Sequence, residues 1–132
     1  MMKLSAEVNF GIQIMINLAK KSKANSFLLS EIALVERKSI SYARQILGKL
    51  RNAELVNRFK DTHSKYSLAK NPEEITLLNI FEAINGKITL LKNKTNMESG
   101  KGGKVTEYYL DKAGEEIAYL YKSIKLSDLL ID

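Results

Sequence analysis

The side chains that could do chemistry in this sequence are mainly cations, and they gather in one stretch. Residues 37–70 contain nine lysines and arginines but only two acidic residues. Clustered cations neutralise phosphates and release counterions, as binding to a nucleic acid requires. A solvated charged surface is the other interpretation of such a run. The nine cations are Arg37, Lys38, Arg44, Lys49, Arg51, Arg58, Lys60, Lys65 and Lys70.

The net charge of the whole chain has the same asymmetry. The 132 residues carry a formal charge of +6 and are 45% hydrophobic and 27% charged, which fits one globular domain. Residues 1–70 hold 13 cations against 5 acids, a balance of +8, whereas residues 71–132 hold 8 against 10. An acidic partner is therefore expected to bind the amino-terminal half.

The residue types that enzymes and metal sites need are scarce. The chain has no cysteine, which excludes disulfides, thiolate nucleophiles and cysteine-ligated zinc or iron–sulfur clusters. Its one histidine, His63, excludes a multi-histidine metal site. Glu115 and Glu116 are adjacent and point to different sides of a helix, so they cannot share a substrate. We therefore predict no catalytic residue, no metal and no cofactor.

The apolar run at residues 8–19 is the earliest candidate for a targeting or membrane segment. Asn9, Gln13 and Asn17 interrupt it and Glu7 precedes it, so it is neither a signal peptide nor a membrane span. We predict a cytoplasmic protein without membrane contact.

Apolar residues in the first part of the chain follow helical spacing. Residues 4–19 form one predicted helix. Phe10 and Ile14 add a second apolar stripe to it, which predicts contact with a second subunit. Ser30 is the predicted cap of a short helix that runs to residue 35.

A third helix, capped by Ser39, carries most of the groups suited to reading a duplex. Its predicted apolar side includes Tyr42 and Leu50. The predicted solvent side combines hydroxyl, guanidinium, amide and ammonium groups, which can pair with base edges and phosphates in a major groove. An ordinary wet helix surface is the alternative interpretation. The solvent-side residues are Ser41, Arg44, Gln45 and Lys49.

Alternating apolar and polar residues follow this helix. The pattern at 55–60, the turn formers at 61–64 and the alternation at 66–69 predict a β-hairpin. Three helices and a basic hairpin indicate a mainly α (α+β) winged helix-turn-helix, whose third helix enters the major groove while the hairpin follows the backbone or the minor groove. Further predicted DNA contacts are Lys38, Arg51, Arg58, Lys60, Thr62, His63, Ser64 and Lys65.

The rest of the chain predicts a second function, dimerisation. A helix over 75–83 ends at Asn85-Gly86, and residues 87–104 are predicted to be a flexible loop. We predict a winged helix-turn-helix domain at 1–86, the loop at 87–104, and a dimerisation helix with a tail at 105–132. The apolar stripe of the dimerisation helix needs the same helix of a second subunit to cover it. The stripe comprises Val105, Tyr109, Ala113, Ile117, Leu120 and Ile124.

Short motifs in these elements give the chain a family resemblance. It resembles the IscR-like (BadM-type) family of bacterial winged-helix transcription regulators, in family order and without a gap between residues 31 and 86. The motifs are Met2-Lys3-Leu4-Ser5, Glu31-Ile32-Ala33, Tyr42 with Gln45-Ile46-Leu47, Lys49-Leu50-Arg51, Leu55-Val56, Tyr66-Ser67-Leu68-Ala69-Lys70, Pro72-Glu73-Glu74-Ile75-Thr76-Leu77 and Ser123-Ile124-Lys125-Leu126-Ser127-Asp128-Leu129.

The resemblance implies a homodimer that binds a palindromic operator in double-stranded DNA, usually as a repressor. The family's wing-tip arginine corresponds to Lys60, and its turn glycine before the third helix is replaced by Arg37. Family members that hold an iron–sulfur cluster carry three cysteines in the loop before the last helix, whereas the corresponding loop of this chain, within residues 87–104, has none. The family's recognition positions correspond to Ser39, Ser41, Tyr42, Arg44 and Gln45.

Two questions stay open at the level of sequence. A winged-helix module that binds a protein partner, with an incidental basic surface, is the alternative function. The effector of a regulator without cysteines is a small ligand, a partner protein or none.

Overall fold

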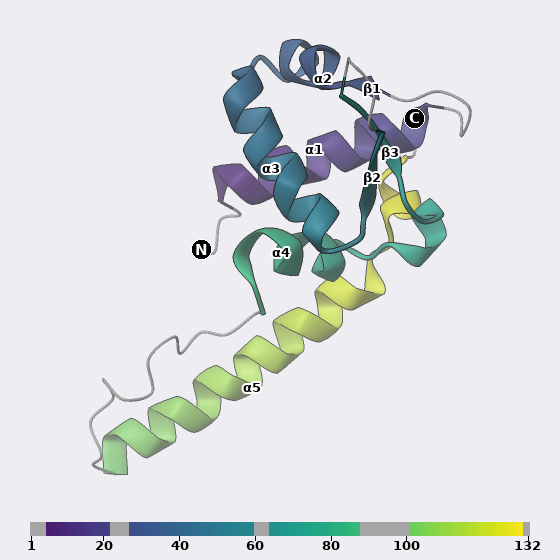
Figure 1. The fold of residues 1–132 in the computed structure, drawn as a ribbon. Helices are drawn as coiled ribbons and strands as arrows, with labels where there is room; N and C mark the ends of the chain where they lie inside the picture. Colours follow the sequence, from purple (N-terminus) through teal and green to yellow (C-terminus); the bar gives the residue numbers. More distant parts are fainter. Residues whose placement is uncertain (1–4, 22–26, 60–63, 88–100, 131–132) are drawn as a thin grey trace.

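The computed structural model describes residues 5–21, 27–59, 64–87 and 101–130. Helices build most of the molecule, and one small antiparallel sheet lies beside them (Figure 1). This arrangement confirms the predicted mainly α fold with a hairpin. No helix within the described residues has the length and hydropathy needed to cross a membrane.

Helix α1, Ala6–Lys20, lies at the centre of the core. The Ser5 hydroxyl accepts a hydrogen bond from the Val8 amide at 3.2 Å and caps the helix. α1 contacts α3, β3, α4 and the carboxy-terminal 3-10 helix, so its own chain covers it on several sides. Phe10 and Ile14 are only 3% and 0% exposed. The prediction that they face a second subunit is wrong, because their side chains are already buried within one subunit.

The two elements after α1 differ partly from expectation. Strand β1, Phe27–Leu28, was not predicted, and helix α2, Leu29–Val35, begins one residue before the predicted cap Ser30. Glu31 accepts a hydrogen bond from the Leu28 amide at 3.0 Å and satisfies a donor at the helix start. Ile32 and Ala33 are buried, as predicted.

The predicted hairpin is confirmed as strands β2, Val56–Phe59, and β3, Lys65–Leu68. The strand order is β1-β3-β2, and Tyr66 pairs with Arg58 on one side and Phe27 on the other. Tyr66 is 3% exposed, so the central strand is anchored in the core.

After the sheet, 3-10 helix η1, Pro72–Glu74, leads into helix α4, Leu77–Asn85. Thr76 and Asn79 cap α4 reciprocally: each backbone amide donates to the other side chain, at 2.8 and 3.0 Å. Gly86 ends α4 with φ of 81°, as the Asn85-Gly86 pair predicts.

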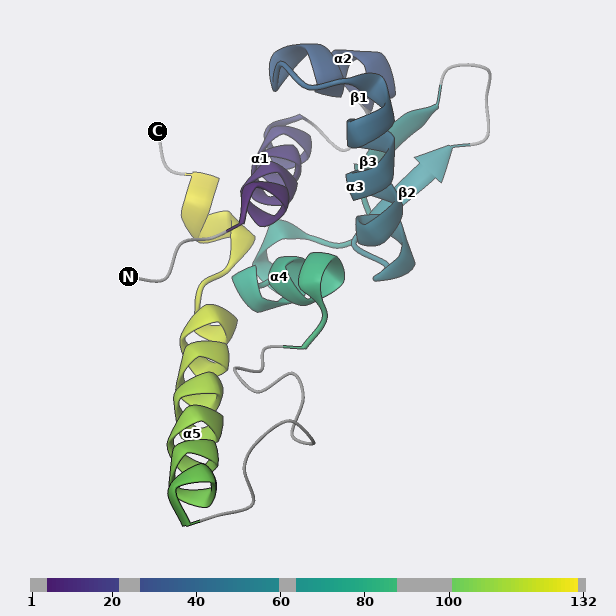
Figure 2. The same cartoon turned by 90° about the vertical axis from the view of Figure 1, so that its left-hand side faces the viewer.

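Helix α5, Lys101–Ser123, extends away from the body, most clearly in Figure 2. It begins four residues earlier than predicted, so residues 101–104 of the predicted loop are helical, and 88–100 lie outside the described residues. Beyond α5 the chain turns back: the Leu77 amide donates to the Ile124 carbonyl at 2.8 Å, and the Leu126 amide to the Ile75 carbonyl at 2.7 Å. The 3-10 helix η3, Leu126–Leu130, then packs on α1.

The close approach of α4 to α1 at Gly11 generates a stability prediction. A Cβ atom at Gly11 would overlap Cδ1 of Ile84. Gly11→Ala is expected to lower stability, because overpacking costs about 1–3 kcal/mol and the helical preference for alanine returns about 1 kcal/mol. Urea denaturation of a double-mutant cycle checks this. Ile84→Val removes Cδ1 and is expected to lower the free energy of unfolding by about 0.5–1.5 kcal/mol on its own. The same change is expected to lower it less in the Gly11→Ala background, because it also removes the overlap. Additive losses would contradict the contact.

Candidate nucleic-acid interface

Helix α3, Ile40–Asn52, is amphipathic and is held firmly by its buried side. Ser39 accepts a hydrogen bond from the Tyr42 amide at 3.0 Å and begins the helix as predicted. Its buried side packs against α1, α2, α4 and β2. The opposite side is therefore presented to solvent in a fixed orientation. The side chains that hold it are Ala43, Ile46, Leu47 and Leu50, each 0% exposed.

The outer side of α3, defined by Ser41, Arg44, Gln45 and Arg51, is exposed, and the first three of these residues were predicted to face solvent. Arg44 and Arg51 are two helical turns apart and lie on one stripe, with the hydroxyl and amide groups beside it. Within the described part of the chain, neither guanidinium has a hydrogen-bond or ion-pair partner, so both keep their donors free. A guanidinium and an amide can each make bidentate contacts with a base edge.

The connection between α2 and α3 also presents cations. Lys38 and Arg37 are both exposed in this turn. The Lys38 amide donates to the Ala33 carbonyl at 2.9 Å and closes the end of α2. Ile40, the first residue of α3, is 48% exposed and was not among the predicted site residues. An apolar side chain here suits contact with a thymine methyl group.

The hairpin, called the wing, adds cations beside α3 on its two described strands. β2 packs against α3, which brings the two elements together. Arg58 is exposed, and its Nη2 atom donates to the Ser64 hydroxyl at 3.4 Å. Lys65 is half-buried. The predicted wing residues Lys60, Thr62 and His63 lie outside the described residues.

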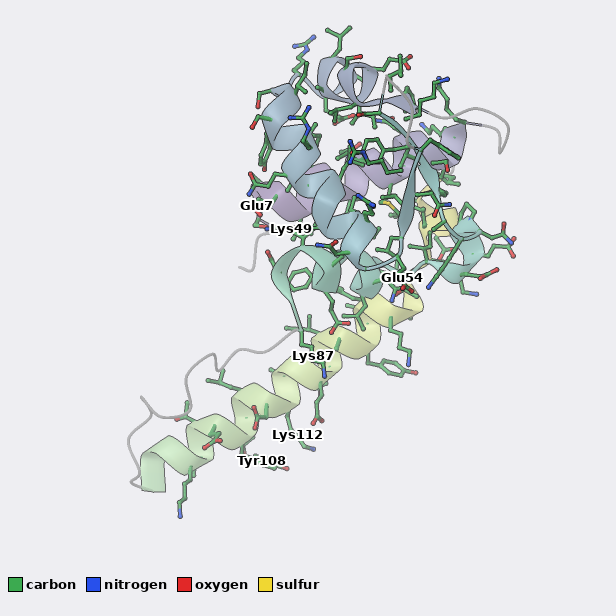
Figure 3. All side chains as sticks on the ribbon, in the orientation of Figure 1. Glu7, Lys49, Glu54, Lys87, Tyr108 and Lys112 are labelled. Atoms are coloured by element: carbon green, nitrogen blue, oxygen red, sulfur yellow. The ribbon has the colours of Figure 1, made fainter. Side chains whose placement is uncertain are left out.

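Two predicted contact residues on α3 have other uses in the structure. Lys49 was expected to face solvent, but its Nζ lies 3.1 Å from Oε2 of Glu7 on α1 and 3.5 Å from the Ile84 carbonyl oxygen (Figure 3). Tyr42 is half-buried, and its ring stacks on Phe10 with centroids 5.1 Å apart. Lys49 is half-buried instead of facing solvent, because it occupies the flank of α3 that faces α1. The DNA contacts of Lys49 and Tyr42 stay predictions.

A second surface lies on α5, far from α3 (Figures 1 and 2). Ala113 and Ile117 are half-buried. Where α5 leaves the body, the ring centroids of Tyr121 and Phe81 of α4 lie 5.7 Å apart. Ile124 lies beyond the end of the helix, at the return of the chain. Tyr108 is placed beside Lys112, whose Nζ lies 5.6 Å from its ring centroid. The exposed apolar residues are Val105 (56%), Tyr108 (56%), Tyr109 (65%), Tyr119 (79%) and Leu120 (56%).

Neither surface has the chemistry of a metal site. The described residues contain no group of three histidine, cysteine, aspartate or glutamate side chains that could hold a metal ion. Ionic and hydrogen-bonding contacts are thus the chemistry that the outer side of α3 and the hairpin can offer.

Comparison with known proteins identifies one family. The family described as "Rrf2: Iron-dependent Transcriptional regulator" matches residues 4–132. The HTH-type transcriptional regulator CymR of Bacillus subtilis is 33% identical over 100 residues, which cover 76% of this chain and 72% of CymR. The regulator IscR of Cereibacter sphaeroides is 27% identical over 135 residues, which cover 98% of this chain and 87% of IscR.

Solved structures agree with these sequence matches. The structure of CymR, described as the global cysteine regulator of B. subtilis, has a TM-score of 0.78 at 29% identity and covers 98% of this chain and 97% of its own. The structure of T. potens IscR has a TM-score of 0.73 at 26% identity, covering 98% and 86%. The resemblance to IscR-like winged-helix regulators is therefore confirmed.

The position of Lys49 generates a prediction about binding to duplex DNA. Arg51→Gln is expected to reduce the slope of log affinity against log salt by about 0.9 for each phosphate that is no longer neutralised. Lys49→Gln is expected to change this slope less, because Glu7 already balances the ammonium charge. Both variants should unfold within about 1 kcal/mol of the unchanged chain, since the Lys49–Glu7 pair is a third exposed or more. If both variants reduce the slope equally, as measured by fluorescence anisotropy, Lys49 also neutralises a phosphate and belongs to the interface.

Proposed function

The chain belongs to the Rrf2 family of transcriptional regulators, and we propose that it acts as a homodimer that binds a palindromic operator and represses transcription. The outer side of α3 carries this proposal: its two guanidinium groups, its hydroxyl and its amide are exposed to solvent beside a basic hairpin. Occupation of a promoter by such a dimer blocks access of the transcription machinery. We assign no catalytic role to any residue of the chain.

The residues of α3 and the hairpin divide into two roles in the proposed complex. Ser41, Arg44 and Gln45 read bases in the major groove, where arginine prefers guanine and glutamine prefers adenine. The remaining residues bind phosphates and fix the register of the protein on the duplex. The phosphate-binding set comprises Lys38, Ser39, Arg51, Arg58, Ser64 and Lys65, with Lys60, Thr62 and His63 at the wing.

The proposed domain organisation assigns DNA binding to residues 1–86, a connection to 87–104 and dimerisation to 105–132. Val105, Tyr109 and Leu120 leave apolar surface uncovered on α5, and a second α5 related by a two-fold axis would bury it. Two half-sites would then be bound by two copies of α3, which requires an inverted repeat in the operator.

The family description refers to iron, but this chain's donor set does not fit an iron–sulfur cluster of the cysteine-ligated kind. Such clusters are held by thiolates, and the sequence contains no cysteine. We therefore propose no role for an iron–sulfur cluster in this chain. The proposed effector is a small ligand, a partner protein or none, in which case the protein represses constitutively.

Arg44 is the residue whose replacement tests base reading most directly. Arg44→Ala is expected to relax the preference at one base pair in each half-site, at a cost of about 1–3 kcal/mol for the preferred base. Competition binding with duplexes that vary one base pair at a time measures this. A uniform loss over all duplexes would instead make Arg44 a phosphate contact.

Leu120 tests the role of α5. Leu120→Glu is expected to weaken dimerisation by at least about tenfold, because a charge would be buried without a partner at the seam. The residue is 56% exposed in the single chain, so folding should be unaffected. Sedimentation velocity measures the change, and Glu115→Gln, five residues earlier on the helix, is the matched control. A monomeric unchanged chain that binds a protein but no DNA would favour the interaction-module alternative.

A further inference from the structure

The turn between α2 and α3 holds an arginine in a backbone conformation that favours glycine. Arg37 has φ of 55°, in the left-handed region. Its amide donates to the Leu34 carbonyl at 3.2 Å, and the next amide, of Lys38, donates to the Ala33 carbonyl at 2.9 Å. Together these bonds close the end of α2 and fix the conformation of Arg37. The fold therefore imposes this conformation whichever residue occupies the position.

Nothing in the described structure offsets the strain through the side chain of Arg37. The residue is exposed, and within the described residues its guanidinium has no hydrogen-bond or ion-pair partner. The neighbouring carboxylate of Glu36 is engaged elsewhere, because its Oε2 accepts a hydrogen bond from Nδ2 of Asn17 at 2.7 Å. Glycine would fit the turn with less strain. The arginine side chain is thus available to a partner outside the chain.

The position of Arg37 indicates what that partner is. It lies two residues before Ser39, which begins α3, and next to exposed Lys38. Glu31, the acid within α2, accepts a hydrogen bond from the Leu28 amide. The turn therefore presents two exposed cations, Arg37 and Lys38, while both neighbouring carboxylates are half-buried and hydrogen-bonded within the chain, and it lies at the same end of α3 as Ser41 and Arg44. A duplex that receives α3 in its groove carries phosphates along both edges of that groove.

We propose that Arg37 binds a phosphodiester of the DNA backbone at the edge of the groove that α3 enters. The inference rests on the proposed function, since the ligand is the duplex. A guanidinium offers two parallel donors to a phosphate, and its charge releases a counterion on binding. The hydrogen-bonded turn fixes the backbone of Arg37 relative to α3, so the guanidinium starts from a constant point beside the groove.

The chain contains a matched control for this proposal. Glu54, labelled at the end of α3 in Figure 3, has φ of 62°. Its amide donates to the Arg51 carbonyl at 2.9 Å, and the Leu55 amide donates to the Leu50 carbonyl at 3.0 Å. Glu54 is exposed like Arg37 and is held by the same pair of bonds, but its charge is opposite. Both positions therefore carry the same backbone strain, while only Arg37 can attract a phosphate.

The test is the salt dependence of binding between the full chain and a mixed-sequence DNA duplex. Arg37→Gln is expected to reduce the slope of log affinity against log salt by about 0.9 per subunit, while Arg37→Lys keeps the slope. Glu54→Gln is expected not to reduce it. Arg37→Gly should reduce the slope as much as Arg37→Gln does, without a lower thermal midpoint, because glycine relieves the strain.

Three results would overturn the proposal. An unchanged slope in Arg37→Gln means that Arg37 neutralises no phosphate. Unchanged DNA binding together with weaker repression of a reporter promoter means that Arg37 binds an acidic protein surface instead. If the unchanged chain shows no salt-dependent binding to DNA, the proposed function fails and the role of Arg37 fails with it. If the unchanged chain binds DNA normally but Arg37→Gln keeps the same slope, only the role of Arg37 fails.

Discussion

The burial of one side of α3 is the constraint on which the rest of the structure depends. Ile46, Leu47 and Leu50 have no exposed surface, and each fully buried aliphatic side chain contributes about 1.5–3 kcal/mol. Because this packing fixes the helix against α1 and the hairpin, the opposite side has one orientation relative to the rest of the basic surface. Reading bases depends on such a fixed register, since a helix that rotated freely would present different groups to the same base pair.

The long helix α5 shows the reverse situation. The buried core of the described residues includes no residue of α5: Leu126 and η3 close it against α1, and α5 packs on α4, with Tyr121 against Phe81. The rest of α5 leaves large apolar side chains in water, which costs free energy unless another surface covers them. A second copy would cover them and would at the same time double the basic surface. In the proposed function, one physical requirement would thus connect dimerisation with recognition of a symmetric site.

Local patterns in the sequence predict most of the fold but few of its long-range contacts. Helical spacing, the Ser39 cap and the Asn85-Gly86 stop are local signals, and the structure confirms the elements that they predict. Strand β1 has only two residues, too few to show a period, and exists because β3 offers an edge. Neither the burial of Phe10 nor the Lys49–Glu7 ion pair was predicted, because each depends on contacts between residues far apart in the chain. The partners of that pair are 42 positions apart, so no short window of sequence contains both.

Selection of bound sequences from random DNA by the unchanged chain is the most direct measurement of the central claim. The claim is that two copies of one fixed basic surface bind a duplex together. It predicts an enriched inverted repeat whose half-site centres are separated by about 10–10.5 base pairs or a multiple of that spacing. Enrichment of no sequence, or of one half-site without a repeat, would contradict it.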